Sequence, residues 1–163
     1  MTYGSQAEQA VSALKERGLH VALAESCTGG LVAKMLTDVP GASEVFECGV
    51  VSYANRIKSN VLGVPATLME EHSVVSAPVA VAMARGVRNL GEADLGIGIT
   101  GVAGPGPDGE HPEGEIFVAL SDGKTDHVVH LQTGTTDRRA ENRRTAAETA
   151  FSLIQTYLTD EPK

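Results

Sequence analysis

The sequence predicts a three-layer α/β/α sandwich around a mixed, mostly parallel five-stranded sheet with one antiparallel strand. Strand and helix patterns alternate along most of the chain, which is typical of parallel strands joined by helices on both sheet faces. One hairpin signal, Asp122-Gly123, places a single strand antiparallel to its neighbours. The 163 residues, 42% hydrophobic and without Trp, suit one domain over residues 1–163 with an aliphatic core.

The first half of the chain alternates between helix and strand signals. Val11 and Leu14 form an apolar stripe on a first helix that Gly18 ends. Asn55 can cap a short helix, because its side chain can accept a hydrogen bond from a backbone N–H group. We therefore expect, in order, strand 20–25, helix 28–37, strand 46–53 and helix 55–62.

The second half contains the clearest amphipathic helix, at 77–90, with Pro78 in its first turn and Gly91 after its end. A run of small apolar residues after it is typical of a strand at the centre of a sheet. We expect, in order, helical turns at 67–72, the helix at 77–90, strands 93–100, 115–121 and 127–132, and a helix at 137–158.

Two glycine-rich segments follow predicted strands and are the main candidates for a binding site. AESCTGG, at 24–30, ends one strand and opens a helix, so we expect its N–H groups and the positive end of the helix dipole to face a ligand. Residues 101–114 follow another strand and are too long for a simple turn. Because ligands bind at the carboxyl ends of parallel strands, both segments should share one cleft.

The net charge of −8 and isoelectric point near 5.0 argue against nucleic-acid or anionic-membrane binding. No apolar run approaches the roughly 20 residues of a membrane span, and the start of the chain does not resemble a signal peptide, so we expect a cytoplasmic protein. Cys27 and Cys48 form neither a disulfide framework nor a metal motif. These features favour a small-molecule partner and predict no metal or cofactor.

Ser26 is the main candidate for a catalytic nucleophile. A serine at a strand-to-helix turn exposes its hydroxyl beside N–H groups that can stabilise an oxyanion. The alternative interpretations are an ordinary helix cap and a phosphate ligand. The pattern is not GxSxG, since Ala24 and Thr28 flank it. Cys27 is an alternative nucleophile or a residue of the pocket wall.

No histidine stands out as a base for Ser26. The first three are scattered, and His127 and His130 point to opposite faces of a strand. Lys58 can act as a base if burial lowers its pKa, with Tyr53 holding the amine or relaying a proton; a solvated lysine is the alternative. The Tyr53 to Lys58 spacing and the missing GxGxxG argue against a dinucleotide oxidoreductase.

The segment 100–106 could wrap a phosphate, although it lacks the Gly-Lys-Ser/Thr ending of a P-loop. Arg139 and Arg143, spaced i,i+4, share a helix face and could bind a phosphate together. A surface or subunit-contact role is the alternative for both.

At these residues the chain resembles the CinA C-terminal domain family, whose active members are nicotinamide mononucleotide (NMN) deamidases. The resemblance spans nearly the whole chain in one order. The matching segments are 24–30, 40–43, 49–55 with Lys58, 63–64, 75–76 and 100–105, followed by Gly114, Arg139 and Arg143.

The resemblance implies hydrolysis of NMN to nicotinate mononucleotide and ammonia by a metal-free Ser/Lys site that serves NAD recycling. Ser26 matches the family's serine and Lys58 its lysine. Neutral Lys58 would take the Ser26 proton, and Ser26 would attack the amide carbon or orient a water. The supporting groups implied are Tyr53, Ser43 and Thr100, the turn residues Cys27, Thr28, Gly29 and Gly30 around the oxyanion, and Gly101, Ala103 and Gly104 around the ribose phosphate.

The chain departs from the family pattern at Ala42, where members often carry a small hydroxyl residue, and at 106–111. Longer members carry an N-terminal domain associated with nucleotide pyrophosphatase activity, which we expect to be absent here. The alternatives to an amidohydrolase are a non-catalytic nucleotide-binding module and a protein partner in competence or DNA-damage responses. Family analogy also favours a homodimer or higher homo-oligomer.

Overall fold

The computed structural model describes residues 4–134 and 137–160 and contains a five-stranded sheet of order β2-β1-β3-β4-β5. β1, β2 and β3 are parallel, and β4 runs antiparallel to both of its neighbours. The predicted fold class is confirmed. The strands are β1 (Val21–Glu25), β2 (Phe46–Val51), β3 (Leu95–Gly101), β4 (Glu115–Ser121) and β5 (Asp126–Gln132).

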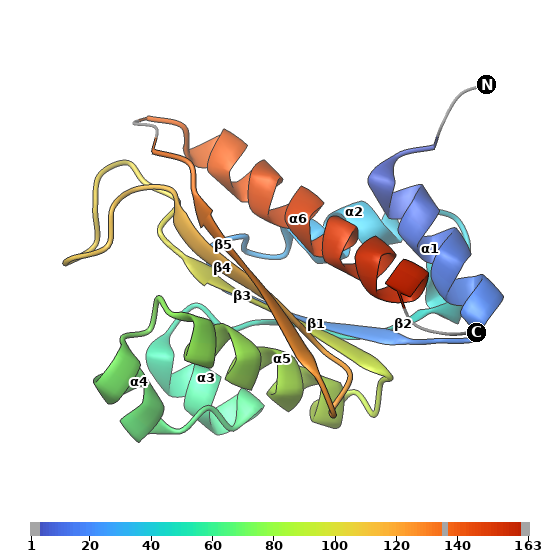
Figure 1. Cartoon of the computed structure of the whole chain (residues 1–163), viewed down its shortest axis with the longest axis horizontal. Coiled ribbons are helices and arrows are strands. Elements are labelled where there is room, and N and C mark those ends of the chain that lie inside the picture. Colours follow the sequence, from blue (N-terminus) through green and yellow to red (C-terminus); the bar gives the residue numbers. More distant parts are fainter. Residues whose placement is uncertain (1–3, 135–136, 161–163) are drawn as a thin grey trace.

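Helices cover both faces of the sheet, which gives the three layers seen in Figure 1. One face carries α1 (Gln6–Arg17), α2 (Leu31–Thr37) and α6 (Arg139–Asp160). The other carries α3 (Asn55–Leu62), α4 (Ala66–His72) and α5 (Ala77–Leu90). A short 3-10 helix, η1 (Ala42–Glu44), precedes β2 and was not predicted.

The central strand β3 divides its side chains between the two layers. Leu95, Ile97 and Ile99 belong to the core under α1 and α6, as the period of two in a strand requires. Between them stand Gly96 and Gly98, and a Cβ atom at Gly98 would lie 2.2 Å from the carbonyl oxygen of Ala80 in α5. These glycines therefore let α5 pack directly against the strand.

Gly98→Ala is expected to destabilise the protein by about 1–3 kcal/mol, because its methyl group forces α5 away from β3. Chemical denaturation of the variant and the parent chain measures the difference. Asn89→Ala, at an exposed position of α5, is the matched control and should stay within about 0.5 kcal/mol of the parent. Equal stability of Gly98→Ala and the parent would show that α5 adjusts without cost.

Several element boundaries differ from the sequence prediction, and two of them, in α2 and β2, affect residues of the predicted site. α2 begins at Leu31 instead of residue 28, because Gly29 and Gly30 adopt φ values of 60° and 99°, outside the helical region. β2 ends at Val51, so Tyr53 lies in the connection to α3.

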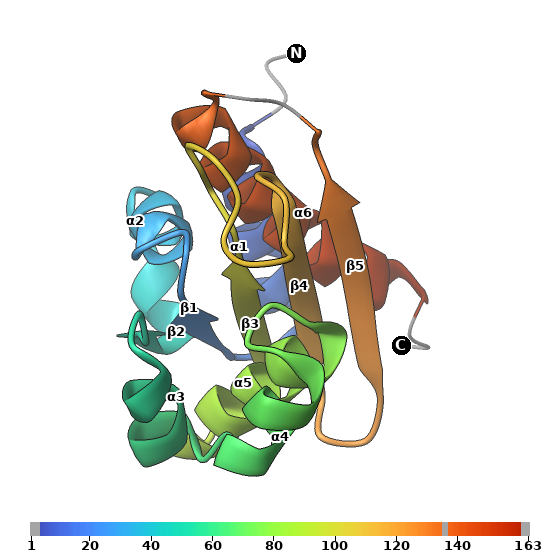
Figure 2. The ribbon, with the colours of Figure 1, turned by 90° about the vertical axis from the view of Figure 1, so that its left-hand side faces the viewer.

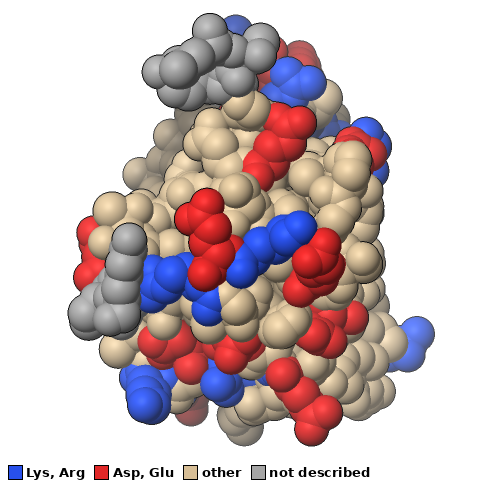
Figure 3. All heavy atoms as spheres, turned by 90° about the vertical axis from the view of Figure 1, so that its right-hand side faces the viewer, with Lys and Arg blue, Asp and Glu red and all other residues tan. Residues whose placement is uncertain are grey.

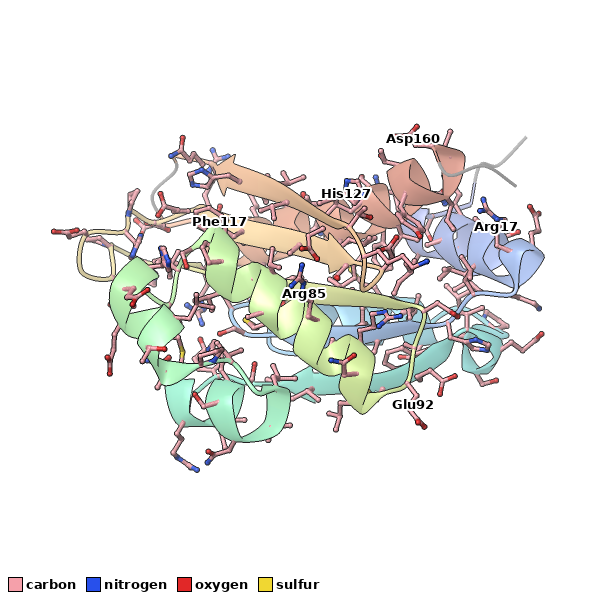
Figure 4. The ribbon with its side chains drawn as sticks, turned by 60° about the horizontal axis from the view of Figure 1, so that its bottom comes forward. Arg17, Arg85, Glu92, Phe117, His127 and Asp160 are labelled. Atoms are coloured by element: carbon pink, nitrogen blue, oxygen red, sulfur yellow. The ribbon has the colours of Figure 1, made fainter. Side chains whose placement is uncertain are left out.

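Acidic and basic side chains are interspersed over the face formed by α1 and the C-terminal end of α6 (Figure 3). On the opposite helix layer, Arg85 of α5 forms an ion pair with Asp126 at the start of β5 (Figure 4). Among the helices of the described ranges, none has the length and apolar character needed to cross a membrane.

Candidate active site

A cavity of about 310 Å³ opens at the carboxyl ends of β1 and β3, where the turn after β1 meets the loop after β3. Figure 2 views this end of the sheet, with the 101–114 loop in yellow between α6 and the α4–α5 connection. The volume is in the range of small-molecule sites. The cavity is lined by Ser26, Cys27, Tyr53, Asn55, Lys58, residues 74–75, residues 100–108 and Arg139.

Lys58 and Ser26 meet at the floor of this cavity, 32 residues apart in the chain. The Nζ atom of Lys58 lies 3.1 Å from Ser26 Oγ, 2.8 Å from the Ser52 carbonyl oxygen and 3.3 Å from that of Tyr53. The side chain reaches them from α3 and is only 1% exposed. Within residues 4–134 and 137–160, no carboxylate forms an ion pair with it.

Burial lowers the pKa of Lys58, because the ammonium loses hydration without gaining a carboxylate. A neutral amine has two N–H groups and one lone pair. The two carbonyl oxygens can accept both N–H groups, which leaves the lone pair for the Ser26 hydroxyl proton. The pair therefore has the geometry of a serine nucleophile with a lysine base.

The expectation that the N-terminus of the helix after the turn faces a ligand is wrong, because Glu25 occupies that N-terminus. Its buried carboxylate accepts hydrogen bonds from the N–H groups of Val32 at 2.9 Å and Ala33 at 3.1 Å. The N-terminus of α2 is thus already neutralised by a residue of the chain itself. The AESCTGG pattern contains this glutamate, but its spacing alone does not show where the carboxylate points.

The turn offers fewer oxyanion donors than its sequence indicates. The Ser26 N–H donates to the Ile99 carbonyl, and the Gly29 N–H donates to the Ser26 carbonyl. Thr28, Gly29 and Gly30 do not line the cavity, whereas Cys27 does. The Cys27 N–H donates to no other residue in the described part of the chain, so it is the turn's remaining candidate donor.

The Cys27 thiol itself is unsuited to be the nucleophile. Burial raises its pKa to about 12, and the thiolate rather than the thiol reacts. This agrees with the interpretation of Cys27 as a wall residue.

Side chains on one face of helix α6 hold both the turn after β1 and the loop after β3 in place. Arg143 donates to the carbonyls of Cys27 at 3.1 Å and Thr28 at 2.8 Å, so it holds the turn instead of facing the cavity. Asn142, which is buried, donates to the Ala103 carbonyl at 3.0 Å. Arg139 donates to the Gly104 carbonyl and lines the cavity. The two arginines that could have bound a phosphate together therefore have different partners, and neither is a simple surface residue.

The structure places the three supporting residues differently, with Tyr53 and Thr100 at the cavity and Ser43 away from it. Tyr53 contacts the Lys58 amine through its backbone carbonyl, while its phenol accepts a hydrogen bond from Arg139 at 3.1 Å. The Thr100 hydroxyl donates to the Val74 carbonyl at 2.9 Å and keeps its acceptor lone pairs. Ser43 is exposed on η1 before the amino end of β2, and the chain does not bring it to the cavity.

Several lining residues were missed by sequence reasoning. Asn55 was expected only as a helix cap, yet the N-cap of α3 is Ala54 and Asn55 lines the cavity. Val74 and Val75 approach from the α4–α5 connection, whereas Asp108 lies in the 106–111 segment that was expected at the rim of the pocket. The described ranges hold no group of three or more His, Cys, Asp or Glu residues that could bind a metal ion.

A model of the CinA C-terminal domain matches residues 4–158. A CinA-like protein of an Anaeromyxobacter species is 51% identical over 150 residues, which are 91% of this chain and 36% of that protein. A CinA-like protein of Syntrophus aciditrophicus is 45% identical over 153 residues, 93% of this chain and 36% of that protein. The chain thus spans about a third of the length of these curated relatives.

Solved structures agree with this similarity. The competence/damage inducible protein CihA of Agrobacterium tumefaciens superposes with a TM-score of 0.88 at 30% identity, over 98% of this chain and 99% of that chain. A competence-damaged protein (CinA) superfamily protein of Klebsiella pneumoniae gives a TM-score of 0.90 at 29% identity, over 96% and 97% of the two chains.

Proposed function

Because this chain belongs to the CinA C-terminal domain family, we propose that it is an amidohydrolase that converts NMN and water to nicotinate mononucleotide and ammonia. One observation carries the proposal. The buried Lys58 amine lies 3.1 Å from the Ser26 hydroxyl, and two carbonyls take its other hydrogen bonds at the floor of a cavity of suitable size.

In the proposed mechanism, neutral Lys58 takes the proton of Ser26 as Ser26 Oγ attacks the carboxamide carbon of NMN. The Cys27 N–H stabilises the oxyanion together with the N–H groups of Ala103 and Gly104, which donate to no residue in the described part of the chain. Lys58 then gives the proton to the leaving ammonia, and water hydrolyses the acyl-enzyme. The positive charge of the pyridinium ring makes the amide carbon more electrophilic.

The ribose phosphate is assigned to the mouth of the cavity. Arg139 is the cationic side chain there other than Lys58, and it is already oriented by the Gly104 carbonyl and the Tyr53 phenol. An arginine is well suited to phosphate because its planar guanidinium donates several hydrogen bonds. The glycines of the 101–106 loop let the backbone approach the same group.

Arg139→Gln is expected to raise the KM for NMN about 10-fold or more with a smaller change in kcat, because the lost contact is made to a non-reacting group. Steady-state ammonia release measures both constants. Arg138→Gln is the matched control, since Arg138 is exposed and pairs with Glu141. A fall in kcat at unchanged KM would contradict the phosphate assignment.

The activity itself is tested by incubating the purified chain with NMN and quantifying ammonia and nicotinate mononucleotide. We expect the two products in equal amounts, and slower turnover of nicotinamide riboside, which lacks the phosphate. Tight NMN binding without ammonia release would instead identify a non-catalytic binding module. Neither binding nor release would favour a role as a protein partner in competence.

A further inference from the structure

A second serine, outside the proposed active site, is hydrogen bonded to a histidine and through it to a carboxylate. Ser73 Oγ lies 2.7 Å from Nε2 of His111, and Nδ1 of the same ring lies 2.6 Å from Oε1 of Glu115. Ser73 follows α4, His111 lies in the 101–114 loop and Glu115 begins β4. The three residues span 43 positions, so only the fold brings them together.

The carboxylate fixes how the imidazole is protonated. Burial alone would raise the pKa of Glu115, but hydrogen bonds from His111 and His130 lower it below its ordinary value. An ionised carboxylate only accepts, so Nδ1 of His111 carries a hydrogen, and in the neutral ring Nε2 then presents its lone pair to Ser73. Serine, histidine and acid thus have the roles found in serine hydrolases.

A second histidine holds the acid in place. Nε2 of His130 lies 3.4 Å from Oε2 of Glu115, and its ring stacks on Phe117 with centroids 4.1 Å apart. Phe117 faces His130 across the β4–β5 ladder and lies beside α5 (Figure 4). The carboxylate that orients His111 is therefore itself oriented by His130, whose ring is held by stacking on Phe117.

Ser73 is accessible and its backbone is strained. It has φ +70°, a left-handed value that costs a non-glycine residue energy and that often marks functional positions. Beside it opens a cavity of about 270 Å³ that Ser73 and His111 line together. The carboxylates of Asp108 and Glu110 also line it, which favours an uncharged or cationic ligand over an anion.

We propose that Ser73, His111 and Glu115 form a second nucleophilic site that hydrolyses small uncharged or cationic carboxylic esters. Ser73 Oγ bonds to the ester carbon while its proton passes to Nε2 of His111. The carbon to alkoxide bond then breaks, and the alcohol leaves with that proton. Water hydrolyses the acyl-Ser73 ester and releases the acid, so the site returns to its starting state.

The test uses the full chain with Ser26→Ala, which removes the other serine nucleophile, and an ethoxy fluorophosphonate probe. The Ser73 oxygen should displace fluoride, and peptide mass spectrometry should find the phosphonyl group on Ser73. Labelling should fall at least about 10-fold after adding His111→Gln or Glu115→Gln, which remove the base or its orienting charge. His127→Gln, a histidine elsewhere on β5, is the control and should leave labelling unchanged.

Glu115→Gln preserves the shape of the side chain. Thermal unfolding of each variant shows whether weaker labelling comes from a Ser73 that is no longer activated or from a protein that no longer folds. In the Ser26→Ala chain, acetylcholine, a small cationic carboxylic ester, should be hydrolysed to choline and acetate, and adding Ser73→Ala should abolish that hydrolysis. No adduct on Ser73, or equal labelling after both Gln substitutions in folded protein, would overturn the site. An adduct without ester hydrolysis would overturn the substrate assignment.

Discussion

Lys58→Met is expected to lower the kcat for NMN hydrolysis by roughly 10³-fold, within the range of general base catalysis. Methionine has a similar length and suits the buried position, but it cannot accept the Ser26 proton. The KM should change less, because Lys58 lies at the floor of the cavity, 3.1 Å from the nucleophile. Steady-state ammonia release with NMN measures both constants.

Lys34→Met is the matched control, because Lys34 is an exposed lysine that pairs with Asp38 outside the cavity. It should retain the parent kcat. A Lys58→Met enzyme that keeps more than about a tenth of the parent kcat would rule out Lys58 as the base, since general base catalysis contributes at least 10²-fold.

Lys58→Met is also expected to change how the free energy of unfolding depends on pH, in a direction set by the lowered pKa of Lys58. Burial holds the pKa of Lys58 lower in the folded than in the unfolded chain, so the unfolded chain binds more protons between the two values. The stability of the parent therefore rises with pH through that window. Lys58→Met removes this dependence, so its stability relative to the parent should be higher near about pH 6 than near about pH 10. Urea unfolding at the two pH values measures the difference.

Local sequence patterns were sufficient to predict most of the fold. Gly18 and Gly91 follow the helices α1 and α5, where the sequence places their ends. Asp122-Gly123 lies between β4 and β5, as a hairpin requires. These features depend on residues close in sequence, so spacing and turn chemistry suffice to predict them. The 3-10 helix η1 has only three residues, too few to give a periodic pattern.

Local sequence patterns could not predict contacts between residues that lie far apart in the chain. The link from Lys58 to Ser26 entered through family resemblance, and spacing alone favoured a solvated lysine. The contact of Ser73 with His111 joins residues 38 positions apart, and the histidines had been interpreted as scattered. Glu25 was part of the quoted motif, yet its role depends on the direction of one side chain. Sequence reasoning located the cleft and left its internal hydrogen bonds undetermined.

Ser26→Ala is expected to have the largest effect on the proposed reaction, a loss of roughly 10⁵-fold or more in kcat. Removing Oγ removes the atom that bonds to the amide carbon, and leaves Lys58 with no hydroxyl to deprotonate. NMN binding should persist, because the proposed phosphate contacts lie at the mouth of the cavity. Ammonia release gives the rate, and calorimetric titration with NMN gives the affinity. Ser12→Ala, at an exposed position of α1, should behave as the parent.

The size of the loss distinguishes two routes through the same residues. If Ser26 forms an acyl-enzyme, rapid quenching of the parent should trap a nicotinyl adduct on Ser26, and the alanine variant should be essentially inactive. If Ser26 only orients a water for Lys58, no adduct forms and the loss should be nearer about 10²-fold, as for other positioned groups. A Ser26→Ala enzyme with the parent rate would contradict both routes, because each requires the hydroxyl 3.1 Å from the Lys58 amine.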